Sequence, residues 1–579
     1  MLSSSPRTSL VGRFVLLLPA LAILVLVGLF SVDVPEDDDW ETPGGIYVAM
    51  AEGGLGFDEL FAFHNESRPA VPRLAYALLL KVFGWNTRVN LVLSWLACLA
   101  SWLALLALLR RHLPPSRGRF WLALVVGLTL FSTAQWKNQL WAIQLFVFLP
   151  PALLTAALWL DETRGSVAGR VLGCAMLSLL ATFSFANGMA CWVLGFPAAA
   201  LLGWGRPLAG ARARTLWAAA YALLGALALA IYFGGPAVVT PAPEVHAAAI
   251  LSAEGGTFLV TWLGAPLTFW FGGETSLAFA VGLGLLLVTA ACALHVARRA
   301  TTEEGRELLR ACRPFACLLA YALLSGIATA VGRLHFGIEA AHAARYATTA
   351  GWFTVALLPI LYLVQRDLRA RGRRRAALAS GGAVLLLAAL VLAAWPAGIA
   401  KMKAHQLQSE QNLLTLRLVE QLPENPLLPE LYRRPQLLIR RLESLGMRDW
   451  LDQDLVGGWL GDQLVKTWRG RRQCDGLATV ERGEKNILHI SGWAKLPDPE
   501  RAADCVLIAL EDEEGELELV SGLTMKRVSP GSGQGRGRKR GPRCKFGDSL
   551  PLSARTRHVH VFAADLEAQQ LYLLPRSDS

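Results

Sequence analysis

Two short polar runs early in the chain hold side chains that could do chemistry. The first is a run of acids, and a carboxylate at the mouth of a membrane cavity can act as a general base or hold a divalent cation. The second packs an imidazole, an amide, a carboxylate and a guanidinium together, which suits sugar hydroxyls and phosphates. The alternatives are a solvated acidic turn and a capped turn. The candidate bases are Asp37, Asp38 and Asp39, and the candidate binding residues are His64, Asn65, Glu66 and Arg68.

Three later hairpins between apolar runs carry further amide, Lys, Arg and aromatic side chains. Polar groups at membrane depth are costly and usually face a cavity or a partner, and Arg and Lys suit a phosphate. The alternatives are aromatic anchoring at the membrane interface, snorkelling of a basic side chain, and a tight turn. Together with a basic residue just after the second polar run, the candidates are Arg73, Gln135, Lys137, Asn138, Gln144, Asn187, Arg333, Glu339, Arg345 and Tyr346.

The cysteines do not form a metal-binding pattern. Nine Cys are scattered along the chain without a CxxC or Cys/His spacing, so no metal site is predicted from them. No Gly-rich phosphate loop is present either, which argues against a nucleotide substrate. Cys474, Cys505 and Cys544 fall in the last part of the chain, where we expect one disulfide without being able to pair them.

Composition requires a membrane to position these residues. The chain is 54% hydrophobic and only 17% charged, and its mean hydropathy is +0.39. Such an excess of apolar residues needs the bilayer as a solvent. The net charge of +11 does not indicate nucleic-acid binding, because the Arg residues sit mainly in short loops between apolar segments, where they set topology.

The apolar runs predict about eleven membrane-spanning helices, which would place the ends of the chain on opposite sides. The first run is too long for a signal-peptide core and has no clear cleavage site, so we expect it to remain as a helix. Basic loops then alternate with loops that hold few basic residues. The expected spans are 13–32, 89–109, 120–136, 141–160, 167–185, 188–204, 215–234, 275–297, 314–332, 344–364 and 376–396.

One apolar run does not fit this alternation. Residues 257–272 are short and contain Pro266, and counting them as a span would move the basic loop at 298–313 to the outer side. We therefore expect a re-entrant or interfacial segment there. The resulting prediction is a multi-pass protein of the bacterial inner membrane, with a cytoplasmic amino terminus and a periplasmic carboxy-terminal domain.

The predicted fold is mainly α, with a small β-sandwich at the end. Residues 1–396 form the membrane domain, in which 33–88 is the first periplasmic loop. Residues 397–470 read as a periplasmic helical linker, with helices at 400–422 and 428–445. Alternating apolar runs at 486–492, 505–510, 516–520, 558–563 and 570–574 then predict the strands of a periplasmic β-sandwich within 471–579.

Several motifs resemble those of a known family. The layout looks like the GT-C superfamily of polytopic glycosyltransferases, and more closely like a group of bacterial membrane proteins with an HNE-x-R motif in the first loop. Ser67 stands where a second His is expected, which argues against a His pair acting on metal or phosphate. The matching residues are Asp39-Trp40, His64 to Arg68, Pro72-Arg73-Leu74, Gln135 to Gln144, Phe185 to Gly188, and Arg345-Tyr346.

This resemblance implies a glycosyltransferase that takes a sugar from a polyprenyl-phosphate carrier and transfers it to an extracytoplasmic glycan or lipid. It also implies an essential acidic residue in the first outer loop, with the need for a divalent cation left open. Two other classes remain as alternatives. One is a transporter or flippase for lipid-linked sugars, and the other is a non-catalytic membrane scaffold that presents the periplasmic domain. Internal repeats and charges at mid-helix would favour the transporter.

Overall fold

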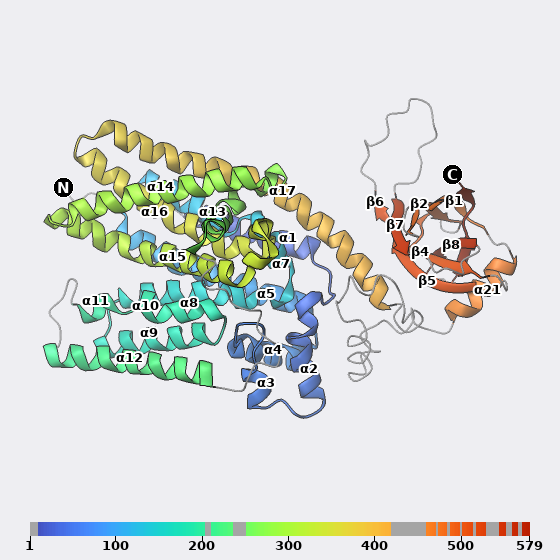
Figure 1. Cartoon of the computed structure of the whole chain (residues 1–579), viewed down its shortest axis with the longest axis horizontal. Coiled ribbons are helices and arrows are strands. Elements are labelled where there is room, and N and C mark those ends of the chain that lie inside the picture. Colours follow the sequence, from blue (N-terminus) through green and yellow to red (C-terminus); the bar gives the residue numbers. More distant parts are fainter. Residues whose placement is uncertain are drawn as a thin grey trace. The chain divides into compact units, whose positions relative to one another are not determined.

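The chain divides into two compact units in the computed structural model (Figure 1). The first contains residues 1–31 and 52–403, and the second contains 32–51 and 404–579. The structure describes residues 10–202, 210–234, 251–417, 459–470, 473–482, 487–497, 501–512, 517–527, 544–551, 558–565 and 570–578.

The first unit consists of helices joined by loops in its described residues. Polar side chains fix several helix starts: Asn86, Ser116 and Thr302 each accept a hydrogen bond from a backbone N–H in the first turn of the following helix. The helices are α1 (Leu10–Phe30), α3 (Phe57–Phe61), α4 (Ala70–Phe83), α5 (Thr87–His112), α6 (Arg117–Leu130), α7 (Trp136–Leu140), α8 (Leu145–Asp161), α9 (Val167–Thr182), α10 (Cys191–Leu194), α11 (Ala198–Leu201), α12 (Ala211–Gly234), α13 (Ala253–Thr268), α14 (Thr275–Arg299), α15 (Glu303–Arg333), α16 (Ala347–Ala370) and α17 (Arg374–Arg417).

Eight of the described helical segments are long and apolar enough to cross a membrane, so the chain is a multi-pass membrane protein. The other three predicted spans correspond to shorter or interrupted helices. The 120–136 run gives α6 with 14 residues, and the 167–185 run gives α9 with 16. The 188–204 run is broken into α10 and α11. The count of eleven therefore stays a prediction.

Buried ion pairs tie the helices together at one end of this unit, which we call the basic end. The Asp161 carboxylate is 1% exposed and lies at the end of α8. It accepts hydrogen bonds at 2.9 Å from the backbone N–H groups of Ala199 and Ala200 in α11. Arg313 of α15 donates to it at 2.8 Å. One carboxylate thus holds three helices, with its charge paired as a buried charge requires.

Two imidazole–carboxylate contacts complete the basic end. His112 Nε2 at the end of α5 lies 2.8 Å from Glu162 Oε2, just after α8. His295 Nε2 in α14 lies 2.8 Å from Asp367 Oδ2 in α16. The ends of α5, α8, α14 and α16 therefore share one side of the unit. The starts of these helices define the opposite end, which we call the polar end.

The short helix α13 packs tightly against α14. Gly264 faces the Ala278 carbonyl so closely that a Cβ could not be accommodated, and Gly282 faces the Val260 carbonyl in the same way. Residue 260 lies opposite 282 and residue 264 lies opposite 278, so the two helices are antiparallel. Small residues at such crossings allow membrane helices to approach closely. With its 16 residues, α13 is not among the eight long spans, and the re-entrant or interfacial segment expected at 257–272 stays a prediction.

The second unit combines residues 32–51 with the carboxy-terminal residues 404–579. It contains the short helix η1 (Asp37–Trp40), α2 (Pro43–Ala51) and the end of α17. Glu36 Oε2 lies 3.3 Å from His405 Nε2, and Ser409 donates to Glu36 Oε1 at 2.5 Å. The acidic run is therefore anchored on α17. The predicted helix at 428–445 lies outside the described residues.

Two sheets form the β domain of this unit, as the alternating sequence pattern predicts. One has the strand order β10-β1-β2-β7-β6, with β3 paired to β2, and the other has the order β5-β4-β8-β9. Gln411 of α17 donates to the Gly522 carbonyl of β5 at 2.6 Å. The elements are α21 (Trp459–Gly470), β1 (Asp475–Arg482), β2 (Ile487–Leu496), β3 (Arg501–Ala502), β4 (Cys505–Glu511), β5 (Leu517–Thr524), β6 (Lys526–Arg527), β7 (Cys544–Pro551), β8 (His558–Asp565), β9 (Gln570–Leu573) and β10 (Arg576–Asp578).

The expected disulfide is not present. Cys474 and Cys505 are both free and buried, and every pairing among the three candidate cysteines would need at least one of them. The sulfurs lie in the apolar interior of the domain instead, where Cys behaves as a small hydrophobic residue. The prediction of a disulfide among Cys474, Cys505 and Cys544 was wrong, because the sequence does not show that the Cys474 and Cys505 thiols are buried.

Candidate functional site

The second polar run is fastened to the membrane unit by Arg68. This side chain is 1% exposed, and it donates to the carbonyls of Tyr232 at 2.5 Å and Phe61 at 2.6 Å. The guanidinium also lies 3.8 Å from the centre of the Phe63 ring. The Tyr232 hydroxyl returns a hydrogen bond to the Glu66 carbonyl at 2.9 Å. Arg68 therefore holds the loop in place, and its donors are directed at backbone oxygens rather than at open space.

Arg73 acts in a similar way on the preceding segment. It is buried and donates to the backbone carbonyls of Leu60 and Ala62. Burial, together with the nearby charge of Arg68, lowers the pKa of Arg73 to about 10. This guanidinium remains positively charged at neutral pH. Two of the four arginines predicted to meet a phosphate, Arg68 and Arg73, are thus engaged with backbone carbonyls.

The remaining residues of the second run face different surroundings. Asn65 has a positive φ of 50°, so it forms the corner of a tight turn closed by backbone hydrogen bonds between His64 and Ser67. The His64 ring lies 5.9 Å from the Phe146 ring. Ser67 is buried, and its hydroxyl accepts a hydrogen bond from the Ala186 N–H at 3.1 Å. The turn is thereby joined to the start of α8 and to the loop after α9.

Glu66 reaches a fourth segment of the chain. Its carboxylate lies 3.6 Å from the Arg333 guanidinium at the end of α15, with 40% and 25% of the two side chains exposed. A pair this open to solvent contributes little to stability. It does, however, leave both charged groups accessible at the polar end.

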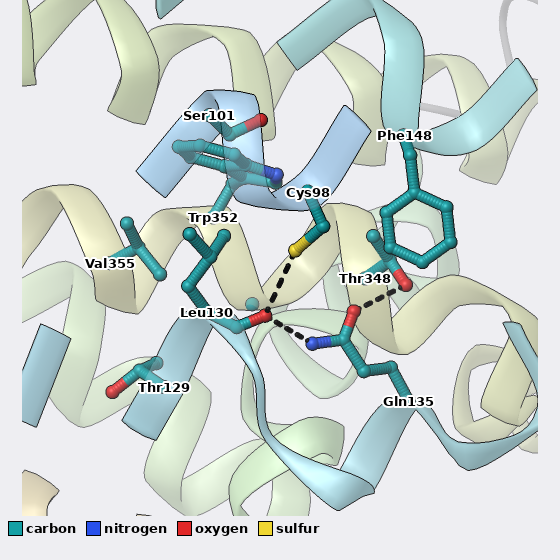
Figure 2. A pocket seen from close by; sticks show the side chains of 10 residues that line it. Cys98, Ser101, Thr129, Leu130, Gln135, Phe148, Thr348, Trp352 and Val355 are labelled. Atoms are coloured by element: carbon teal, nitrogen blue, oxygen red, sulfur yellow. Dashed lines mark hydrogen bonds between the residues drawn. The ribbon is translucent and has the colours of Figure 1, made fainter. Parts of the chain in front are cut away.

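A buried network of side-chain amides joins the 135–144 hairpin to α16, and Figure 2 shows the part of it around Gln135. The Thr348 hydroxyl donates to Gln135 Oε1 at 2.7 Å. It also accepts a hydrogen bond from Asn138 Nδ2 at 2.7 Å. Asn138 Nδ2 also donates to the Arg345 carbonyl at 2.8 Å, and Gln135 Nε2 donates to the Leu130 carbonyl at 2.6 Å. The network fixes the hairpin between α6 and α8 against the start of α16. Thr348 was not predicted from the sequence, although a Thr one turn after the Arg-Tyr pair in an apolar helix is a usable signal.

A small cavity adjoins this network. It has a volume of about 10 Å³ and is lined by Gln135, Thr348, Ser101 and Thr129 among others. Figure 2 shows Gln135 and Thr348 on one side of it and Cys98 on another. A polar cavity of this size accommodates about one water molecule. It is too small for a sugar, so this cavity is not the substrate-binding site.

Asn187 belongs to a second buried polar group. Its Nδ2 donates to Ser325 Oγ in α15 at 3.0 Å. The Oδ1 atoms of Asn187 and Asn138 are both buried, and neither has a hydrogen-bond donor within the described part of the chain. Buried acceptors of this kind call for a water or a ligand group. Ser325 was also missed from the sequence.

The other cationic candidates lie on the same side. Lys137 lies 4.7 Å from the centre of the Trp141 ring, and the Arg345 guanidinium lies 5.2 Å from that of Tyr346. Both distances are within the range of cation–π interactions. Glu339 is exposed in the segment between α15 and α16, while Gln144 is buried at the start of α8.

The three candidate bases belong to the second unit. Asp39 is 1% exposed, and its Oδ2 accepts a hydrogen bond from the Glu36 N–H at 3.0 Å. Asp37 and Asp38 are half-buried, so their carboxylates are more open than that of Asp39. Within the described residues no three His, Cys, Asp or Glu side chains gather as a metal site would require.

Comparisons with known proteins complete the description. No protein-family model matches the chain, and no curated protein matches it. Among solved structures, the crystal structure of ArnT from Cupriavidus metallidurans in the apo state aligns with 61% of this chain and 77% of its own, at 15% sequence identity and a TM-score of 0.29.

Proposed function

We propose that this protein is a GT-C-type membrane glycosyltransferase. It would move a sugar from a polyprenyl-phosphate donor to an extracytoplasmic glycan or lipid. The observation that carries the proposal is the convergence of four distant segments at the polar end. Contacts of the 64–68 turn, the 135–146 hairpin, the 183–188 loop and the 325–348 segment join them there. Polar groups at membrane depth are costly, so the gathering of this many of them favours a binding site over a simple turn.

The charges at this end suit a lipid phosphate. Lys137, Arg333 and Arg345 bring three cations to one side, whereas Arg68 and Arg73 are committed to backbone carbonyls. Within the described residues, the partner of Arg333 is the exposed Glu66, and a phosphate could replace Glu66 there. Arg forms charge-assisted, often bidentate hydrogen bonds to phosphate oxygens. We assign the donor phosphate to Arg333 and Arg345, with Lys137 beside them.

The reaction needs a base for the acceptor. The acidic run lies between α1 and the 64–68 turn along the chain, and the resemblance to GT-C enzymes implies an essential acidic residue in this loop. We assign the base to Asp37 or Asp38, because Asp39 is buried and bonded to the Glu36 backbone. The carboxylate takes the proton of the acceptor hydroxyl, whose oxygen bonds to the anomeric carbon of the sugar. The bond from that carbon to the phosphate oxygen breaks, and polyprenyl phosphate leaves.

The test is a transfer assay with the purified full chain. The protein is incubated with a panel of radiolabelled polyprenyl-phosphate sugars and a membrane extract as the source of acceptor. We expect Asp38→Asn combined with Asp37→Asn to lower transfer by about a hundredfold or more, the usual contribution of a general base. Arg333→Gln should weaken donor binding and raise KM more than it lowers kcat.

Matched variants control for charge and folding. Asp58→Asn removes a carboxylate from an exposed position in the same loop, and Arg310→Gln removes a cation from the basic end, so both should transfer as the parent does. Donor binding without transfer from any sugar would favour a carrier-lipid transporter. Absence of both binding and transfer would favour the scaffold and overturn the proposal.

A further inference from the structure

A groove lies between three helices of this unit and begins at the basic end. It has a volume of about 400 Å³ and is lined by α6, α16 and α17. That volume falls within the range of small-molecule sites. Each helix contributes one face: residues 118, 121, 122 and 125 of α6 are spaced as neighbours on a helix surface, as are 378, 381, 382 and 385 of α17. The groove therefore runs along the helices.

Most of the lining is apolar and open to the surroundings. Trp121, Leu378 and Leu385 are 60%, 68% and 73% exposed, as expected for side chains that face lipid. Glycines keep the groove hollow, because a Cβ at Gly382 would meet no atom within 4 Å. The wall is thus suited to a hydrocarbon chain.

Polar groups gather on one wall of the groove, and α16 supplies all of them. Tyr362, Gln365 and Arg369 follow one another at helical spacing. Gln365 is 8% exposed, and its side-chain amide makes no hydrogen bond to any described residue. The Arg369 guanidinium is exposed and lies one residue from the end of α16. This end of the groove thus carries a guanidinium, an amide and a phenol next to the apolar part of the groove.

The length of the groove matches one leaflet of a bilayer. From Leu378 to Ala388 the helix α17 rises by about 15 Å, which is about half of the hydrocarbon thickness of a bilayer. Arg369 and Leu378 lie at the basic end, because α16 finishes there and α17 starts there. A lipid of the leaflet on that side could place its headgroup at Arg369 and one chain along α17.

The charge of the surrounding segment selects the headgroup. Residues 366–375 contain six arginines and a single acid, and that acid, Asp367, already faces His295 and Arg299. Arginines at a membrane surface attract anionic lipids. We propose that the groove binds one anionic phospholipid, with its phosphate on Arg369 and Gln365 and an acyl chain against Trp121 and Leu385. This site is separate from the proposed donor site and does not depend on it.

The experiment is native mass spectrometry of the full chain after exchange with vesicles of equal phosphatidylglycerol and phosphatidylcholine. The parent should retain one phosphatidylglycerol in preference to phosphatidylcholine. Arg369→Gln should reduce that preference about fivefold. Gly382→Phe places a ring in the groove from a position where a Cβ meets no atom within 4 Å, and it should remove the retained lipid of either type.

Each variant has a matched control. Arg310→Gln removes an exposed charge at the same end outside the groove, and Gly284→Phe places the same ring on α14, where a Cβ also meets no atom within 4 Å. Both should retain lipid as the parent does. Equal retention of the two lipids by the parent, or unchanged retention in Gly382→Phe, would overturn the proposal. So would displacement of phosphatidylglycerol by added polyprenyl phosphate at equal concentration, which would make the groove a carrier-lipid site.

Discussion

Arg68 carries its charge where water does not reach, and its donors satisfy the carbonyls of Phe61 and Tyr232. Replacing it by Met keeps much of the volume but leaves both carbonyls without that donor. An unsatisfied buried polar group costs about 1–3 kcal/mol, so Arg68→Met should lower the free energy of unfolding by roughly 3 kcal/mol. A thermal shift of the purified protein in detergent measures this loss, and the exposed Arg310→Met serves as the control, for which we expect little change. Equal midpoints for the two variants would contradict the assigned role.

The arginines also show where residue-level prediction stops. The sequence identifies Arg68, Arg73, Arg333 and Arg345 as candidates with the same chemistry. The structure distinguishes them by burial: Arg68 and Arg73 are buried and donate to backbone carbonyls, which lie far away in the sequence for Tyr232 and in the same loop for Leu60. Residue type can be read from a sequence, but the partner of a guanidinium depends on tertiary packing.

The free thiols of the β domain give a second test at this scale. Burial raises the pKa of Cys474 to about 11 and that of Cys505 to about 12. A raised pKa keeps a thiol protonated, and the thiolate is the reactive form. At pH 8 both residues should therefore resist a maleimide in the native protein and react after denaturation without added reductant. Peptide mapping by mass spectrometry reports each site, and labelling that requires a reductant would reveal a disulfide after all.

At the scale of helices, the crossing of α13 and α14 depends on two glycines. A side chain at Gly282 would collide with the backbone of Val260, whereas at Gly284 a Cβ meets no atom within 4 Å. Gly282→Val should force the helices apart and lower stability by about 3 kcal/mol, in the upper range of overpacking effects. Gly284→Val adds the same side chain two residues away on the same helix and should have little effect. A thermal shift of both variants in detergent decides between them, and similar losses would contradict the close crossing.

Elements with strong periodicity were predictable, and interrupted ones were not. The strands expected at 486–492, 505–510, 516–520, 558–563 and 570–574 correspond to β2, β4, β5, β8 and β9. β1 and β7 were missed, because Gly476, Gly547 and the neighbouring charges interrupt their apolar alternation. In the membrane unit the 188–204 run is uniformly apolar, so hydropathy alone could not show that it breaks between α10 and α11.

For the whole molecule, the number of crossings decides where the β domain lies. Eight crossings would leave the two ends of the chain on the same side of the membrane, and eleven would separate them. The contact between His112 and Glu162 puts the ends of α5 and α8 on one side. Since both helices run toward that side, the chain between them has to return across the unit, and α6 is the helix available for this. Asp161, the last residue of α8, accepts a hydrogen bond from the start of α11. The chain between α8 and α11 therefore has to cross the unit and return, through α9 and α10.

These contacts favour three further crossings by the short helices, and hence eleven in total. Fusions to the full chain test this count: a phosphatase active only in the periplasm and a fluorescent protein that folds only in the cytoplasm are placed in turn at each terminus. We expect fluorescence at the amino terminus, because Arg residues gather in the loops on that side, and phosphatase activity at the carboxy terminus. A matched pair of fusions after Arg164, in the short loop between α8 and α9, should report the cytoplasmic side. Fluorescence at both termini would mean an even number of crossings, and it would place the β domain away from any extracytoplasmic acceptor.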